Sequence, residues 1–265
     1  MFSKSLNFFH KIRERYIAQR LCPEQMKHDD LYLVEYPKSG VTYLCHILGS
    51  MEFNSEEFEI NYFNVHSFIP DIHESKKISA KKGKNLKRRI IKSHGSHNRQ
   101  YRYVIHLVRN PLDIMISYKN YWLSHWGKDI EFSDLIRSWR GIPRWVRHTE
   151  SWINSDVNQR YIPINYQALV DEPEKTIRYI YKCYGATVSD ELITNAIEKS
   201  NYKNMQESEE FWNYGHRPKF TNAKFVGEKK FGKDSVSEED LIYIKENTSE
   251  LYSTISEMCK KCIRS

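Results

Sequence analysis

The stretch that decides the fold is VEYPKSGVTYLCHIL, residues 34–48. An apolar run rich in β-branched and aromatic residues, LYLVEY (31–36), ends at Pro37, and helical spacing resumes at once over 39–50. Gly40 lets backbone approach a ligand closely, and the free N–H groups of a helix start would point back at the loop. The stretch therefore predicts a strand, an anion-binding loop and a helix.

Three kinds of donor meet in this loop. Lys38 adds a mobile positive charge, and Ser39 and Thr42 add hydroxyl groups to the backbone donors. The Walker A pattern needs its lysine after the last glycine, whereas Lys38 comes before Gly40, and no G-x-G-x-x-G is present. The loop is therefore neither an ordinary ATP-binding P-loop nor a dinucleotide site, and a plain turn stays open as the alternative.

Strand-like and helix-like segments alternate along the rest of the chain. Further strands are expected at 88–93, 103–108 and 161–166, and helices at 39–50, 112–126, 134–154, 174–184, 189–200 and 238–260. Alternation of this kind predicts an α/β fold of three layers, a mainly parallel central sheet flanked by helices. Such sheets bind ligands outside the carboxyl ends of their strands, where the motifs of this chain fall.

The composition suits one domain over residues 1–265, since 40% of the residues are hydrophobic. A net charge of +7 favours an acidic partner. No apolar run of 18 residues and no export signal is found, so we expect a cytoplasmic protein without a transmembrane segment.

The five cysteines are an odd number, which indicates free thiols. Residues 1–28 read as an N-terminal amphipathic helical segment that packs on the core or meets anionic lipid, and 74–89 as a solvated basic loop.

A second anion motif follows the strand at 103–108. In YVIHLVRNPLDIMISYKNYW (103–122), Arg109 stands at the strand end and Ser117 eight residues later, inside the next helix. An arginine fork and a hydroxyl can bind a second phosphate. A local salt bridge between Arg109 and Asp113 is the alternative.

Together the two segments resemble the PAPS-dependent sulfotransferases, which move a sulfuryl group from 3'-phosphoadenosine 5'-phosphosulfate (PAPS) to an acceptor and leave PAP. YPKSGVTY (36–43) resembles the 5'-phosphosulfate loop of that family, and RNPLDIMIS (109–117) resembles its 3'-phosphate motif. The resemblance runs with gaps over about residues 31–240 and implies the P-loop-like sulfotransferase fold. It assigns donor contacts to Lys38, Ser39, Gly40, Val41, Thr42, Tyr43, Arg109 and Ser117.

Other stretches are similar to further parts of the same family. IIKSHGSH (90–97) matches a strand that ends in Lys-Thr-His, which puts Lys92 and His94 beside the sulfuryl centre. The resemblance also places Tyr166, Ser200, Tyr202 and Met205 around adenine.

The chain departs from the family pattern at several positions. Val41 stands where threonine is usual, and Tyr43 where tryptophan is common. The family's C-terminal Arg-Lys-Gly element is replaced by a stretch in which the candidate donors to the 3'-phosphate are Lys224, Gly227, Lys229 and Lys230. The family's dimer segment is only partly recognisable there, so a homodimer stays open.

The resemblance implies roles for three side chains. Lys38 would stabilise the leaving oxygen, Lys92 the sulfuryl oxygens, and His94 would remove the acceptor proton. Rival bases are His46, His73, His97 and Glu35. We expect no metal, because the histidines show no ligand spacing.

The acceptor is the least determined part. EINYFNVHSFIPDIHES (59–75) suits an acceptor wall, although a loop packed on the core fits equally, and it resembles the polysaccharide-directed bacterial branch. A carbohydrate acceptor is therefore expected, with a small hydroxylated metabolite as the alternative. Two other classes stay open, a non-catalytic PAP- or polyanion-binding protein and a basic nucleic-acid binder, although we expect no nucleic-acid partner.

Overall fold

The computed structural model describes residues 25–55, 58–61, 64–73, 78–126, 129–154, 160–201, 203–204 and 231–264. Its core is one sheet of four parallel strands: β1 (Leu31–Glu35), β2 (Ile90–Ser93), β3 (Tyr103–Val108) and β4 (Arg160–Asn165). The strand order is β2-β1-β3-β4. The predicted α/β fold with a parallel sheet is confirmed, and all four expected strands are present within two residues of their predicted limits.

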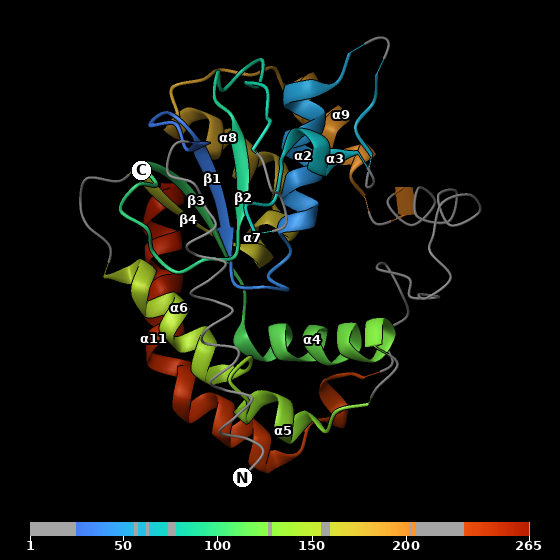
Figure 1. Cartoon of the computed structure of the whole chain (residues 1–265), viewed down its shortest axis with the longest axis vertical. Helices are drawn as coiled ribbons and strands as arrows, with labels where there is room; N and C mark the ends of the chain where they lie inside the picture. The colour runs from blue at the N-terminus through green and yellow to red at the C-terminus, as the bar shows by residue number, and fades with distance from the viewer. Residues whose placement is uncertain are drawn as a thin grey trace.

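Helices flank the sheet on both sides (Figure 1). Their limits are α2 (Val41–Phe53), α3 (Val65–Phe68), α4 (Pro111–Trp126), α5 (Phe132–Arg137), α6 (Ile142–Ile153), α7 (Tyr166–Asp171), α8 (Pro173–Cys183), α9 (Asp190–Lys199) and α11 (Glu238–Arg264), with a 3-10 turn at Lys233–Ser235.

Alternation along β1 decides which helices cover which face. Leu31 and Leu33 belong to a core shared with α2, α7, α8 and α9, while Tyr32 and Val34 pack toward Trp152 of α6. The helix α11 lies on that second side, where Ile255 contacts Val108 at the end of β3. Because every residue of β1 is buried, its sequence is apolar almost without interruption, as expected for a strand covered on both faces.

The prediction of one continuous helix over 134–154 is wrong. The structure has two helices, α5 and α6, with a turn over residues 138–141 between them. A side chain at Gly141 would lie 2.2 Å from the carbonyl oxygen of Ile136, so the backbone folds back closely there. Pro143 then occupies the first turn of α6, a position that proline favours.

The strand expected over 161–166 ends one residue early. The side chain of Asn165 accepts hydrogen bonds from the backbone N–H groups of Gln167 and Ala168 and so caps α7, a helix that the sequence did not predict. Tyr166 is therefore the first residue of a helix. The strand predicted from residue 88 begins two residues later, at Ile90, and the side chain of Arg89 just before it pairs with Asp30.

The end of the sheet at β4 carries a proline. Pro163 lies opposite His106 in the register of β3 and β4 and is buried. Proline supplies no N–H group to a neighbouring strand, so it is compatible with an edge position.

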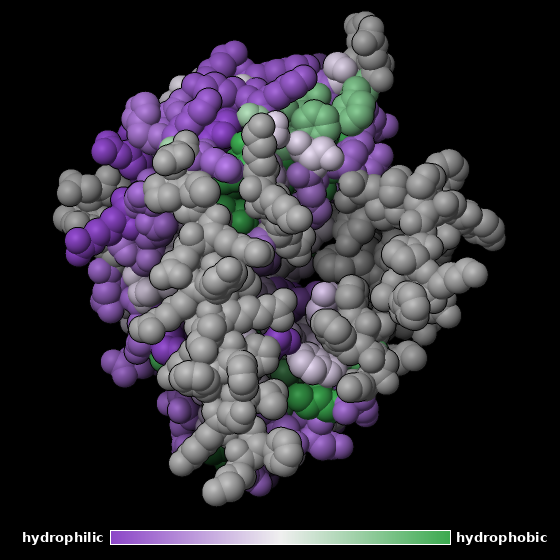
Figure 2. All heavy atoms as spheres, in the orientation of Figure 1, coloured by the Kyte–Doolittle hydropathy of each residue, from purple (hydrophilic) through white to green (hydrophobic). Residues whose placement is uncertain are grey.

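On the face shown in Figure 2, hydrophilic side chains dominate the described residues and apolar ones form separate patches. Among the helices of the described residues, none is long and apolar enough to span a bilayer. The predicted N-terminal segment 1–28 falls outside the described residues up to 24, and so do positions 74–77 of the basic loop.

A candidate anion and proton-transfer site

The loop after β1 is built on two residues with left-handed backbone. Lys38 has φ 78° and Gly40 has φ 103°. A side chain at Gly40 would lie 2.2 Å from Cε2 of Tyr166, so only glycine fits against that ring. In Figure 1 the carboxyl end of β1 faces α4, and the loop lies at this end of the sheet.

Arg109 joins the second predicted anion motif to this loop. Its Nη1 donates a hydrogen bond of 3.0 Å to the backbone carbonyl of Lys38, and its guanidinium carbon lies 4.6 Å from the centre of the Tyr166 ring. Nε of Arg109 is buried without a hydrogen-bond partner among the described residues. A buried donor of this kind suits an anion, so the residues fit a phosphate-bearing ligand.

Two of the predicted loop donors are used within the loop itself. Oγ of Ser39 donates to the carbonyl of Tyr36 at 2.8 Å, and the backbone N–H of Val41 donates to Oε2 of Glu35 at 2.9 Å. Glu35 therefore places a carboxylate at the start of α2, where an anion is favourable. Glu35 was expected only as a rival base, and this hydrogen bond was not predicted from the sequence.

Lys38 points toward α4, with Nζ lying 4.2 Å from the ring centre of Tyr121. Burial lowers the pKa of Lys38 to about 8, and the charges of Lys92 and Arg109 add to the decrease while Glu35 opposes it. A cation that is partly stripped of water in this way gains from the arrival of a phosphate or sulfate.

His94 lies between two carboxylates. Its Nε2 is 3.4 Å from Oδ2 of Asp71, and its Nδ1 is 3.5 Å from Oε1 of Glu35. The imidazole keeps 21% of its surface exposed, whereas the two carboxylates are almost completely buried. The imidazole of His94 is therefore reachable from solvent and lies beside two buried carboxylates.

Lys92 shares one of these carboxylates, since its Nζ lies 3.1 Å from Oδ2 of Asp71. Burial acts to lower the pKa of Lys92, but Asp71 and Glu35 outweigh it and hold the value above its usual range. Burial likewise acts to raise the pKa of Asp71, which His94 and Lys92 nevertheless hold well below its usual range. Asp71 was not among the predicted site residues; its only sequence signal was an acidic residue set between apolar ones in FIPDIH (68–73).

The rival histidines lie in different places. His73 is beside His94, with ring centres 6.1 Å apart, and burial lowers its pKa to about 4. His46 is buried in α2, where Nδ1 lies 3.3 Å from Oγ of Ser200 and burial lowers its pKa to about 4. His97 packs edge-on against Trp152 of α6, with ring centres 5.4 Å apart.

The remaining predicted donor contacts divide into three groups. Thr42 and Tyr43 are half-buried in the first turn of α2, and burial with the nearby Tyr166 raises the pKa of Tyr43. Ser117 is half-buried on α4, whereas Ser200 is fully buried and donates to the carbonyl of Ala196 at 2.7 Å. The predicted residues outside the described part of the chain are Tyr202, Met205, Lys224, Gly227, Lys229 and Lys230.

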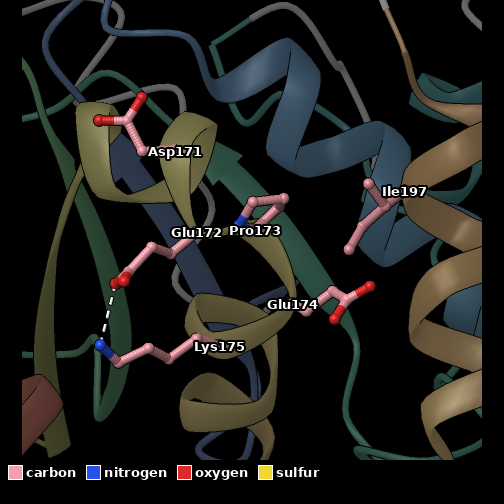
Figure 3. Close-up of a pocket in the computed structure, with 6 residues that line it drawn as sticks. All are labelled: Asp171, Glu172, Pro173, Glu174, Lys175 and Ile197. Atoms are coloured by element: carbon pink, nitrogen blue, oxygen red, sulfur yellow. Dashed lines mark hydrogen bonds and ion pairs between the residues drawn. The ribbon is translucent and has the colours of Figure 1, made fainter.

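A cavity of about 370 Å³ lies away from these residues (Figure 3). It is lined by Asp171, Glu172, Pro173, Glu174, Lys175 and Ile197, from the corner of α7 and α8 and from α9. Lys175 is paired with Glu172 at 2.9 Å, which leaves the lining acidic. Such a cavity repels an anionic ligand and contains none of the predicted site residues. No group of metal-ligating side chains occurs in the described parts of the chain.

Comparison with known proteins gives the following relatives. A family model described as a sulfotransferase domain matches residues 28–255. Sulfotransferase 1E1 of Bos taurus is 25% identical over 225 residues, which cover 78% of this chain and 72% of the relative. Sulfotransferase 2A1 of Homo sapiens is 22% identical over 216 residues, with 75% and 71% covered.

Solved structures are similar in fold. Mouse sulfotransferase SULT7A1 complexed with PAP gives a TM-score of 0.62 at 18% identity, covering 92% of this chain and 94% of that one. Retinol dehydratase in complex with androsterone and PAP gives a TM-score of 0.60 at 14% identity, with 88% and 83% covered.

Proposed function

This chain belongs to the sulfotransferase family, and from that premise we propose which of its residues transfer a sulfuryl group from PAPS to an acceptor hydroxyl. The observation that carries the assignment is the contact between the two anion motifs, which Arg109 makes with the Lys38 loop. Arg109 contacts both the Lys38 loop and Tyr166, so one ligand with two anionic ends can be bound across them.

The donor would be bound by side chains of both motifs. Lys38 and the backbone of the loop would face the 5'-phosphosulfate, and Arg109 with Ser117 the 3'-phosphate. The buried Nε of Arg109, which has no hydrogen-bond partner among the described residues, and the desolvated ammonium of Lys38 support this assignment, since an anion would accept a bond from the first and offset the lost hydration of the second. Lys224, Lys229 and Lys230 remain proposed further donors to the 3'-phosphate.

The transfer step needs positioning and charge stabilisation more than covalent help. A bond forms between the acceptor oxygen and sulfur while the bond from sulfur to the bridging phosphate oxygen breaks. Lys38 would stabilise the negative charge that builds on the leaving oxygen, and Lys92 the charge on the sulfuryl oxygens. PAP leaves with that negative charge, and the sulfated acceptor is the second product.

The acceptor proton goes to His94 in this scheme. Asp71 and Glu35 lie 3.4 and 3.5 Å from the two ring nitrogens, so two carboxylates flank the group that would take up the proton. His73 stays a rival because it lies beside His94, although the buried environment that lowers its pKa disfavours the protonated form. His46 and His97 make poorer candidates, because one is engaged with Ser200 and the other packs on Trp152.

For the acceptor, a small hydroxylated molecule is now the better supported proposal. The retinol dehydratase structures hold androsterone or retinol together with PAP, and each of these compounds carries a hydroxyl group. The carbohydrate acceptor expected from the sequence stays a second proposal, which rests on the resemblance of 59–75 to the polysaccharide-directed branch. A cytoplasmic location and a homodimer stay predictions, which cell fractionation and light scattering of the purified protein would test.

The test measures donor binding and transfer separately. Calorimetry with PAP should show binding, and labelled PAPS should transfer sulfate to at least one compound among 4-nitrophenol, androsterone, retinol and cellobiose. Sulfation of cellobiose alone would favour the carbohydrate proposal. Binding of PAP without transfer to any acceptor would favour the non-catalytic PAP-binding alternative, and no binding of PAP or PAPS would refute the donor site.

A further inference from the structure

Asp71 is a buried carboxylate that contacts two groups of the proposed reaction at once. Its Oδ2 lies 3.1 Å from Nζ of Lys92 and 3.4 Å from Nε2 of His94. Its Oδ1 accepts a hydrogen bond of 2.8 Å from the backbone N–H of His73. Only 3% of the residue is exposed, so these contacts are largely screened from water.

The backbone holds Asp71 in register with Lys92. The N–H of Lys92 donates to the carbonyl of Pro70 at 2.9 Å, and the N–H of Ile72 donates to the carbonyl of Lys92 at 3.0 Å. These two bonds make a parallel bridge between Asp71 and Lys92 beside β2. Ile69 and Ile72 on either side of this bridge are buried in the core, so the carboxylate is fixed relative to the strand.

The charges around Lys92 come from every element packed against it. The charged groups are Glu35 of β1, Lys38 of the loop after β1 and Asp71 beside β2, and the other titratable groups are the buried thiol of Cys45, His73 and His94. Lys38 repels Lys92, whereas Glu35 and Asp71 attract it. Of the two carboxylates, Asp71 is the one that forms an ion pair with Lys92, and it therefore contributes most to keeping this buried lysine charged.

We propose that Asp71 is a positioning residue for sulfuryl transfer, which holds the ammonium of Lys92 and the imidazole of His94 in fixed relation to each other. The inference rests on the proposed function. An ammonium group has three donors, so Lys92 can keep Asp71 as a partner while its other N–H groups face the sulfuryl oxygens. Preorganised charges of this kind cost no reorganisation during the reaction.

The alternative is a salt bridge that serves stability alone. Asp30 provides the matched control, because it is equally buried and pairs with Arg89 at the opposite end of β1. Loss of Asp30 should destabilise the fold without touching the site.

The experiment compares the variants Asp71→Asn, Asp71→Glu and Asp30→Asn with the wild-type protein. Thermal unfolding, the calorimetric affinity for PAP, and kcat and KM between pH 6 and 10 are measured for each. Turnover uses PAPS with the compound that the wild type sulfates fastest among 4-nitrophenol, androsterone, retinol and cellobiose. Transfer to water, followed as PAP formation, serves if none of these is sulfated.

Asp71→Asn should lower kcat at least tenfold while the affinity for PAP changes less than threefold. The alkaline limb of its pH profile should move to lower pH, because Lys92 loses a carboxylate that helps to keep it protonated. Asp71→Glu should restore part of kcat, since it returns the charge at a shifted distance. Asp30→Asn should unfold at lower temperature and keep the wild-type pH profile.

Two results would overturn the role of Asp71. One is an Asp71→Asn variant with wild-type kcat and pH profile. The other is a variant in which thermal stability, PAP affinity and kcat fall together and Asp71→Glu restores none of them. A wild-type protein that neither binds PAP nor forms it from PAPS would instead refute the proposed function.

Discussion

Nη1 of Arg109 donates a hydrogen bond to the backbone carbonyl of Lys38, although 71 residues separate the two in the sequence. The bond joins the loop after β1 to the end of β3, the two neighbouring strands at the centre of the sheet. A guanidinium that is already held by one carbonyl keeps its other donors in a fixed direction. Arg109 is thus both a part of the proposed 3'-phosphate site and a support for the Lys38 loop.

Arg109→Lys should weaken the binding of PAP about 10- to 100-fold. The lysine keeps the charge but loses the planar fork, and a hydrogen bond to a charged group contributes about 1.5–3 kcal/mol. Calorimetry measures the change. Arg102→Lys, at an exposed arginine just before β3, is the control and should bind PAP as the wild type does. Equal affinity in both variants would contradict a donor role for Arg109.

Gly40→Ala should destabilise the fold and abolish PAP binding, because the new methyl group would meet the ring of Tyr166. Gly185 is the matched control, since it has φ 72° and open space around its Cα. Gly185→Ala should lower the free energy of unfolding by about 1–2 kcal/mol from backbone strain alone. Gly40→Ala should cost about 1–3 kcal/mol more, and urea unfolding of the two variants compares them. Equal costs would mean that the ring moves away freely.

The affinity for PAP should fall as the pH rises above about 8. Lys38 has its pKa lowered to about 8 in the free protein, mainly by burial. A bound polyanion favours the ammonium form and raises that pKa, so binding takes up a proton above pH 8 and loses up to about tenfold in affinity per pH unit. Lys38→Arg stays charged and should bind with a flat profile over pH 7–10. An equal loss of PAP affinity with pH in the wild type and in Lys38→Arg would mean that a group other than Lys38 titrates.

His94→Gln should lower kcat roughly 10²-fold or more, because the variant loses the proposed proton acceptor but keeps a polar side chain. Its affinity for PAP should stay close to that of the wild type, since His94 contacts carboxylates and not the anion loop. His28→Gln, at an exposed histidine, is the control for turnover. Undiminished turnover of His94→Gln would exclude His94 as the base and direct attention to His73.

Asp30→Asn should lower the free energy of unfolding by about 3–5 kcal/mol, because it leaves the buried guanidinium of Arg89 without its carboxylate. In the wild type, Nε and Nη2 of Arg89 bond to the two oxygens of Asp30 at 2.7 and 2.6 Å. Lys82→Ala breaks the exposed pair with Asp29 and should cost about 0–1 kcal/mol. Urea unfolding distinguishes the two, and similar costs would contradict the burial argument.

The sequence predicted those parts of the fold whose signals are local. The strand, loop and helix over 31–50 could be found because Pro37 and Gly40 mark a break between two different periodicities. The turn over residues 138–141 was not predicted, because apolar spacing continues across it. Only the close approach of Gly141 to the end of α5 interrupts the helix. Helix α7 was missed for a similar reason, since its cap at Asn165 follows directly on a strand.

In the candidate site, too, the contacts that follow from local sequence signals could be predicted, and those that depend on the folded core could not. Lys38 and Arg109 follow strand ends, and parallel strands bring their carboxyl ends to one edge, so their meeting could be expected. The hydrogen bond from the Val41 N–H to Glu35 and the ion pair of Lys92 with Asp71 could not be expected, because each depends on side-chain directions that the folded core decides. Asp71 and Lys92 lie in separate segments, and no local spacing relates them.

Pro163 in β4 has a consequence for self-association. A strand at the end of a sheet presents backbone groups on which a second molecule can add a strand, and this is a common start of aggregation. At Pro163 one donor of such a ladder is missing, so an incoming chain would find an interrupted template. If this edge were uncovered, Pro163 would therefore make it a poorer template for a neighbouring molecule.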